Sequence, residues 1–268
     1  MPTARVNGVE LYYEESGSGD PLLFISGLGR DHLSWALVTP HFEQERRCIV
    51  FDNRGTGKSE VPPGPYTIEE MADDTAALIR ELGIGPTDVV GVSLGGSVLQ
   101  ALSYRHPDVV RRAVFVSAFP NYTPVQHAWL DCLLALREQG VDEVSQSIMG
   151  MAWVFTPRAL YDHETAAQNA KIGVEAAPPA PKAGFEAQAV AIRTFDSRSE
   201  LHKATAPSLI LVGAEDVLTP PYQSAEMASL MPNAKLQILP RGSHGVVAEY
   251  MDDVIGAIKR WFKESNEV

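Results

Sequence analysis

Short apolar runs alternate with helix-like stretches along this chain, and this alternation restricts the fold more than any other feature. Each run has the mostly apolar character of a strand buried on both faces of a sheet. Since consecutive parallel strands need a helical crossover, we expect an α/β fold with a mostly parallel sheet and helices on both faces. The runs are Leu22–Ser26, Arg47–Phe51, Asp88–Val92, Ala113–Ser117, Ser208–Val212 and Lys235–Leu239.

Other segments predict the edges of this sheet and two of its helices. Val9–Glu15 alternates apolar and polar residues before a Gly- and Pro-rich turn, which favours an antiparallel edge. Ile68–Leu82 has helical spacing, with Thr67 as the expected N-cap and Gly83 as the stop. Val254–Phe262 is expected to form a closing helix.

The alternation breaks once, before the last two runs. No strand-like run occurs between about Asn121 and His202. Helical spacing occurs there in Leu130–Leu136 and Ser145–Trp153. A long irregular loop is improbable inside a compact domain, so a helical cap is the better interpretation. We therefore expect the first part of an α/β core in residues 1–120, a cap in 121–202 and the rest of the core in 203–268.

A serine between two glycines follows the third run, in Gly91-Val-Ser93-Leu-Gly95. A tight strand-to-helix turn would expose the Ser93 hydroxyl, and the glycines remove Cβ atoms that would collide there. Such a motif arises by chance in roughly one chain of this length in ten, given ordinary glycine usage. Its interpretation therefore depends on whether an acid and a base follow.

Both partners follow later runs. Asp216 comes after Ser208–Val212, and His244 comes after Lys235–Leu239. The carboxyl ends of parallel strands meet at one edge of the sheet, where ligands bind, so we expect Ser93, Asp216 and His244 to converge. In this interpretation His244 removes the serine proton, Asp216 orients the imidazole, and Ser93 attacks a carbonyl carbon.

An oxyanion would need two hydrogen-bond donors near the serine. The backbone N–H of Leu94 begins the predicted helix after Ser93. The backbone N–H of Leu28, in Ser26-Gly-Leu28-Gly29 after the first run, is the second candidate.

One motif resembles a phosphate-binding loop. Gly55-Thr-Gly-Lys-Ser59 follows a strand-like run, but a full loop of that type needs glycine at position 52, which is Asp52. The proline-rich segment after Ser59 cannot supply the helix that should follow. We therefore set nucleotide hydrolysis aside.

With these motifs in place, the chain resembles the α/β-hydrolase superfamily over essentially its whole length, most of all the small capped carboxylesterases and the 3-oxoadipate enol-lactone hydrolases. The resemblance implies an eight-stranded sheet, a helical lid and ester hydrolysis without a cofactor or metal. It assigns nucleophile, acid and base to Ser93, Asp216 and His244. One departure is Ser26, where many members have histidine. The matching segments are 26–29, 51–59, 91–96, 213–216 and 242–244.

Substrate specificity would come from the cap and from the loops around Ser93. An apolar lining would favour an uncharged ester with a hydrophobic part. A substrate carboxylate would instead need a cation such as Arg30, Arg137, Arg158 or Arg193. We expect fewer than half of the candidate lining residues to contact substrate. They are Trp35, Phe119, Trp129, Leu133, Met149, Trp153, Leu218 and Val246.

Composition restricts the partners. A net charge of −12 and a pI near 5.0 argue against nucleic acid and anionic membranes. Two cysteines, Cys48 and Cys132, make no disulfide framework, and no metal-ligand spacing surrounds them. The sequence shows no signal-peptide core and no membrane-length apolar segment. We expect a cytoplasmic monomer or homodimer that acts on a small molecule.

Several functions share these features. The leading hypothesis is a serine hydrolase of esters or lactones, including enol-lactones of aromatic catabolism. The same triad could hydrolyse a carbon–carbon bond in a vinylogous diketone or accept peroxide. A ligand-sensing protein with slow turnover is the non-enzymatic alternative, and fold alone does not decide among them.

Overall fold

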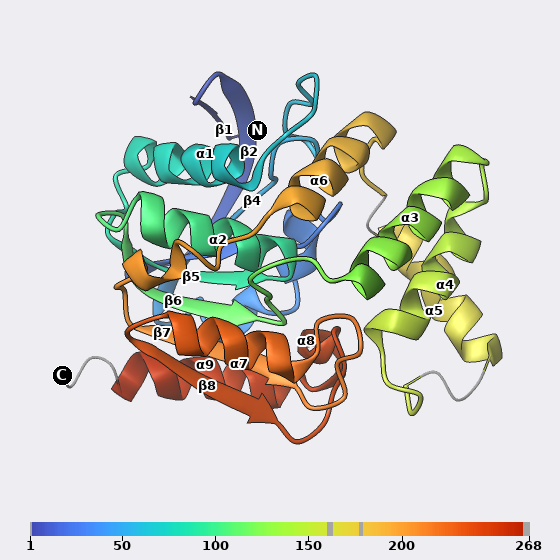
Figure 1. Cartoon of the computed structure of the whole chain (residues 1–268). Coiled ribbons are helices and arrows are strands. Elements are labelled where there is room, and N and C mark those ends of the chain that lie inside the picture. The colour runs from blue at the N-terminus through green and yellow to red at the C-terminus, as the bar shows by residue number, and fades with distance from the viewer. Residues whose placement is uncertain (1, 160–162, 177–178, 265–268) are drawn as a thin grey trace.

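An eight-stranded sheet forms the centre of the molecule, with strand order β1-β2-β4-β3-β5-β6-β7-β8 (Figure 1). The computed structural model describes residues 2–159, 163–176 and 179–264. Strands β1 and β2 pair antiparallel, and β2 pairs antiparallel with β4, as the alternation at the N-terminus predicts. From β4 to β8 every pairing is parallel. The predicted α/β sheet is confirmed.

The six predicted buried runs each form a strand, although one of them is not buried on both faces. β8 lies at the edge of the sheet, where Ile238 is 47% exposed. The prediction of two-sided burial was wrong there because an edge strand has a neighbouring strand on one side only, so fewer side chains cover its residues. The strands are β1 Thr3–Val6, β2 Val9–Gly17, β3 Asp20–Ile25, β4 Arg46–Phe51, β5 Thr87–Val92, β6 Val110–Val116, β7 Ser208–Gly213 and β8 Ala234–Leu239.

Helices cover both faces of the sheet. One hydrophobic core lies between the sheet and α1, α2 and α7 and includes residues of α6, and a second lies between the sheet and α8 and α9. Among the described residues no helix is long and apolar enough to cross a membrane. The helices are α1 Ile68–Glu81, α2 Leu94–Arg105, α3 Pro124–Glu138, α4 Glu143–Val154, α5 His163–Ala176, α6 Lys182–Thr194, α7 Pro221–Leu230, α8 Val246–Glu249 and α9 Met251–Glu264, with 3-10 turns at His32–Trp35, Thr39–His41 and Leu201–Lys203.

Local sequence signals set the bounds of α1. The Thr67 hydroxyl accepts a hydrogen bond from the N–H of Glu70 at 3.0 Å. The Glu70 carboxylate in turn accepts from the N–H of Thr67 at 3.1 Å. Gly83, just past the last turn, has a positive φ of 63°. The predicted cap and stop are therefore confirmed, because two orphan N–H groups find partners and glycine tolerates the left-handed turn.

Four helices, α3 to α6, occupy the interval between β6 and β7 (Figure 1). The chain leaves and re-enters the core at neighbouring points, because Asn121 and Asp196 form an isolated antiparallel bridge. The N–H of Ser197 also donates to the carbonyl of Pro120 at 2.9 Å. The division at residues 121 and 202 stays a prediction.

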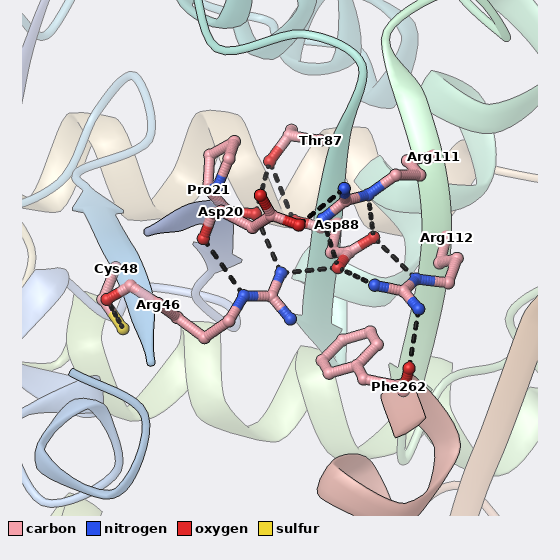
Figure 2. A network of polar contacts seen from close by, with 9 residues as sticks. All are labelled: Asp20, Pro21, Arg46, Cys48, Thr87, Asp88, Arg111, Arg112 and Phe262. Atoms are coloured by element: carbon pink, nitrogen blue, oxygen red, sulfur yellow. Dashed lines mark hydrogen bonds and ion pairs between the residues drawn. The ribbon is translucent and has the colours of Figure 1, made fainter. Parts of the chain in front are cut away.

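A cluster of arginines surrounds the buried carboxylate of Asp88, near the start of β5 (Figure 2). Ser93 follows the other end of the same strand. Arg46 donates to it at 2.5 Å, and Arg111 and Arg112 each donate through two nitrogens at 2.6–2.9 Å. Arg112 also donates to the carbonyl of Phe262 at 2.7 Å. This network joins three strands to the last turns of α9.

Candidate active site

Ser93 occupies a strained turn between β5 and α2. Its φ of 53° and ψ of −119° lie outside the regions that residues other than glycine usually adopt. The turn closes tightly, because a Cβ on Gly91 would clash with the carbonyl of Gly95, and a Cβ on Gly95 would clash with the carbonyl of Ile25. Strain of this kind costs about 1–3 kcal/mol and persists only where packing imposes it. The serine side chain remains partly exposed.

The structure brings the three predicted side chains together. His244 Nε2 lies 3.0 Å from the Oγ of Ser93, and His244 Nδ1 lies 3.2 Å from Oδ2 of Asp216. Asp216 is 3% exposed and His244 is 9% exposed. With the proton on Nδ1, the imidazole donates toward Asp216 and presents a lone pair to the serine hydroxyl.

Thr219 completes this arrangement, although sequence reasoning missed it. Its hydroxyl oxygen lies 2.7 Å from Oδ2 of Asp216 and 2.9 Å from Nδ1 of His244. The other carboxylate oxygen accepts the N–H groups of Leu218 at 2.9 Å and Thr219 at 2.7 Å. The buried carboxylate is therefore hydrogen-bonded on both oxygens, as a charged buried group requires.

Ser117, at the end of β6, supports the same side chains. Its φ of 49° is also in the left-handed region. The Ser117 hydroxyl donates to the carbonyl of His244 at 3.1 Å, and the Ser117 carbonyl oxygen lies 3.2 Å from the hydroxyl oxygen of Thr219. The positive φ could not be read from the sequence, because it depends on neighbours from β7 and the His244 loop.

The loop of residues 26–29, here named the oxyanion loop, runs beside the serine. A Cβ built on Gly27 would lie 3.5 Å from the Cβ of Ser93. Among the hydrogen bonds of the described residues, the N–H groups of Leu28 and Leu94 have no acceptor. Both predicted donors are thus free in the part of the chain that the structure describes.

Ser26 anchors the oxyanion loop through its side chain and its carbonyl. Its hydroxyl donates to the carbonyl of Asp31 at 2.9 Å and accepts the indole N–H of Trp35 at 3.0 Å. Asn53 donates to the carbonyl of Ser26 at 3.4 Å. The loop therefore keeps its own set of side-chain contacts.

Asp52 and Arg54 hold the loop after β4. The Asp52 carboxylate accepts the N–H groups of His32 and Lys58, each at 2.7 Å. Arg54 binds both oxygens of Asp74 at 2.6 and 2.8 Å. This segment is a pinned loop without a following helix until α1 begins at Ile68, so the resemblance to a phosphate-binding loop ends there.

Three of the predicted lining residues lie within the hydrophobic cores. Phe119 belongs to the core beneath α2, and its ring centroid is 5.3 Å from that of Tyr122. Val246 and Trp35 belong to the core on the opposite face, where Trp35 packs against Phe24 at 5.0 Å between ring centroids.

The remaining candidates lie closer to the inserted helices. Leu218 is buried in the loop after β7. Trp129 and Leu133 on α3 pack partly buried against the core, and the indole N–H of Trp129 is buried with no acceptor among the described residues. Met149 and Trp153 are partly exposed on α4.

The loop that carries His244 contacts α4 directly. The N–H of Gly245 donates to the carbonyl of Val154 at 2.6 Å. Glu249 accepts from the N–H of Ser243 at 2.8 Å and from the hydroxyl of Thr156 at 2.6 Å. These contacts tie the segment after α4 to the residues on either side of the imidazole.

The sheet order, the strained serine turn and the converged side chains define a hydrolase of the α/β type. The chain belongs to the α/β hydrolase fold family, because the family model described as alpha/beta hydrolase fold matches residues 20–249.

Known proteins of this fold resemble the chain over nearly its full length. The Mycobacterium tuberculosis protein BpoC, provisionally named a non-heme bromoperoxidase, is 29% identical over 95% of this chain and 98% of its own. The enol-lactonase structure from Burkholderia xenovorans LB400 has a TM-score of 0.86 and 26% identity, covering 98% of this chain and all of that one. A thermophilic esterase from Thermogutta terrifontis has a TM-score of 0.84 and 26% identity, covering 98% and 99% of the two chains.

Proposed function

We propose that this protein hydrolyses carboxylic esters or lactones through an acyl-enzyme formed on Ser93. The observation that carries the proposal is the 3.0 Å contact between His244 Nε2 and the Oγ of a serine held in a strained turn. Relatives named as an enol-lactonase and an esterase support the same reaction class.

The reaction divides into two steps. His244 takes the Ser93 proton as the oxygen attacks the carbonyl carbon, and the N–H groups of Leu28 and Leu94 stabilise the oxyanion. The imidazolium then returns its proton to the leaving alcohol, which breaks the C–O bond and leaves the serine acylated. Water, activated by the same imidazole, releases the acid.

Asp216 keeps the imidazole usable in both steps. Its carboxylate accepts from Nδ1, which fixes the tautomer that leaves Nε2 free to accept the serine proton. The hydrogen bonds on both of its oxygens stabilise the charge that balances the imidazolium.

Hydrolysis of a short-chain nitrophenyl ester tests the proposal. Wild-type protein should turn the ester over, and Ser93→Ala should lower kcat by roughly 10⁴-fold or more, because the nucleophile is gone. His244→Ala should lower kcat by a similar factor, since removing one member of a catalytic unit costs about as much as removing another. Wild-type turnover retained in Ser93→Ala would remove this serine from the mechanism.

A specific observation favours a second substrate class, esters or lactones that carry a carboxylate. Arg137, on α3, is half-buried and has no carboxylate within ion-pair distance among the described residues. Burial lowers the pKa of its guanidinium, although the negative charges of Glu143 and Glu186 act to raise it. Among the other candidate cations, Arg158 binds Glu215 at 2.9 Å and Arg193 pairs with Asp131, whereas Arg30 is exposed.

The surroundings of Arg137 leave room for a ligand. The guanidinium carbon lies 3.8 Å from the ring centroid of Phe185, and the Nε atom is buried without a partner among the described residues. Phe185 packs in turn against Gly29 of the oxyanion loop. A cavity of about 230 Å³ beside the guanidinium is lined by Arg137, Val141, Glu143, Gln146, Pro179, Ala180 and Lys182.

Matched esters with and without a terminal carboxylate separate the two classes. If Arg137 binds the anion, Arg137→Met should raise KM for the charged ester by about ten-fold and leave the neutral ester unchanged, as expected for the loss of one charge-assisted contact. Arg158→Met is the matched control, because that arginine is exposed and already paired. An equal effect on both esters would leave the uncharged class as the substrate.

A further inference from the structure

Helix α6 packs directly on the core loops, unlike α4, which has no buried residue. Gly184 fits against Gly55 so closely that a Cβ would clash with the Gly55 carbonyl. The ring of Phe185 lies against Gly29, where an added Cβ would be 2.6 Å from the ring. Helix α6 therefore contacts both the oxyanion loop and the loop after β4.

Between these two contacts lies Gln188, whose side chain is fully buried. Its carbonyl oxygen accepts the N–H of Gly29 at 3.0 Å, and its NH₂ group donates to the carbonyl of Arg54 at 2.8 Å. An unpaired buried amide is costly, so both bonds hold the side chain in one orientation. The amide thus bridges two loops that belong to different strands.

The bond to Gly29 fixes the shape of the oxyanion loop. The N–H of Arg30 donates to the carbonyl of Gly27 at 3.1 Å, which closes a four-residue turn. Gly29 has a φ of 65° and Leu28 has no positive φ, as in a type II turn. Type I and type II turns differ by a flip of their central peptide, here Leu28–Gly29. Gln188 accepts the N–H of that peptide and so selects one of the two orientations.

The other end of the bridge rests on a rigid group. Arg54 is buried, binds both oxygens of Asp74, and donates to Glu70 at 3.1 Å. Since Asp74 and Glu70 lie on α1, Gln188 links the oxyanion loop to a helix of the core.

We propose that Gln188 is a positioning residue for ester hydrolysis: its buried amide fixes the Leu28–Gly29 peptide and so holds the turn in which the preceding Gly27–Leu28 peptide directs the Leu28 N–H to the oxyanion. The inference rests on the proposed function of Ser93. Helix α6 thereby helps to stabilise the transition state through the oxyanion loop, although no atom of that helix needs to contact the reacting carbonyl.

Gln188→Met tests the proposal, because methionine keeps the length of the side chain and removes both hydrogen bonds. With a neutral nitrophenyl ester we expect kcat to fall by about 10- to 100-fold while KM stays within about three-fold, since a displaced donor weakens transition-state binding more than substrate binding. Rates are divided by the fraction of protein that a phosphonate probe can titrate, so that unfolded protein does not lower kcat.

Gln100→Met is the matched control. Gln100 is also fully buried and also bridges two segments, donating to the carbonyl of Phe119 at 3.0 Å and accepting from the hydroxyl of Ser197 at 2.7 Å. The two variants should lose similar thermal stability, but Gln100→Met should keep kcat within about two-fold. Equal falls of kcat in both variants, or no fall in Gln188→Met, would overturn the proposal.

Hydrogen exchange separates this inference from the proposed function. The peptide containing Gly29 should exchange faster in Gln188→Met than in wild type, because its amide loses its acceptor. Unchanged exchange would overturn the role of Gln188 whatever the catalytic result. A wild-type protein without esterase activity would overturn the proposed function, and the exchange measurement would still decide whether Gln188 holds the loop.

Discussion

The hydroxyl of Thr219 lies within hydrogen-bond distance of both Asp216 and His244, and it is closer to Nδ1 than the carboxylate is, at 2.9 Å against 3.2 Å. If the hydroxyl donates to Asp216, its lone pair shares the Nδ1 proton with the carboxylate. The Thr219 hydroxyl then contributes both to the direction of the imidazole and to the hydrogen bonding of Asp216.

Thr219→Val should therefore lower kcat for ester hydrolysis by about 3- to 10-fold with little change in KM, the amount expected from one lost hydrogen bond. Thr219→Ser should retain most of the wild-type rate, because the hydroxyl remains. Steady-state kinetics of the three proteins provide the measurement. A serine variant as slow as the valine variant would show that packing of the methyl group, rather than the hydroxyl, matters at this position.

At the level of the elements, local patterns predicted most of the sheet and much less of the site's support. Ser93, Asp216 and His244 could be placed because each follows a strand, and parallel strands end at one edge. Gln188 could not be found that way, because its bond to Gly29 spans 159 residues and a buried glutamine looks like any helix residue. Thr219 was missed for a related reason, since a hydroxyl three residues after an acid is common in turns. The edge position of β8 depends on strand order, which apolar runs do not encode.

For the molecule as a whole, the arginine cluster around Asp88 links the start of the sheet to α9 (Figure 2). Burial alone would raise the pKa of Asp88, but hydrogen bonds from Arg112 and Arg111 and the charge of Arg46 outweigh burial and lower that pKa below its ordinary value. A carboxyl with a lowered pKa in the folded state stabilises the fold above its unfolded pKa. That stabilisation disappears as the pH falls through the folded pKa.

Asp88→Asn should therefore destabilise the protein by about 3–5 kcal/mol near pH 7, because three guanidinium groups lose their buried counter-charge. The difference from wild type should begin to shrink below about pH 4, where Asp88 of the unfolded wild-type chain binds a proton that the folded state still excludes. Urea unfolding of both proteins at several pH values measures this. A difference that stays constant from pH 7 to pH 3 would mean that the charge of Asp88 contributes nothing to stability.

The role of Ser93 is tested by the site at which a fluorophosphonate attaches to the folded protein, mapped by mass spectrometry of its peptides. We expect one adduct, on Ser93, because among the serines of the described chain this one combines a strained turn with an imidazole 3.0 Å away. Ser93→Ala should remain unlabelled. No adduct on folded wild-type protein, or an adduct on another residue, would contradict the claim that Ser93 is the nucleophile.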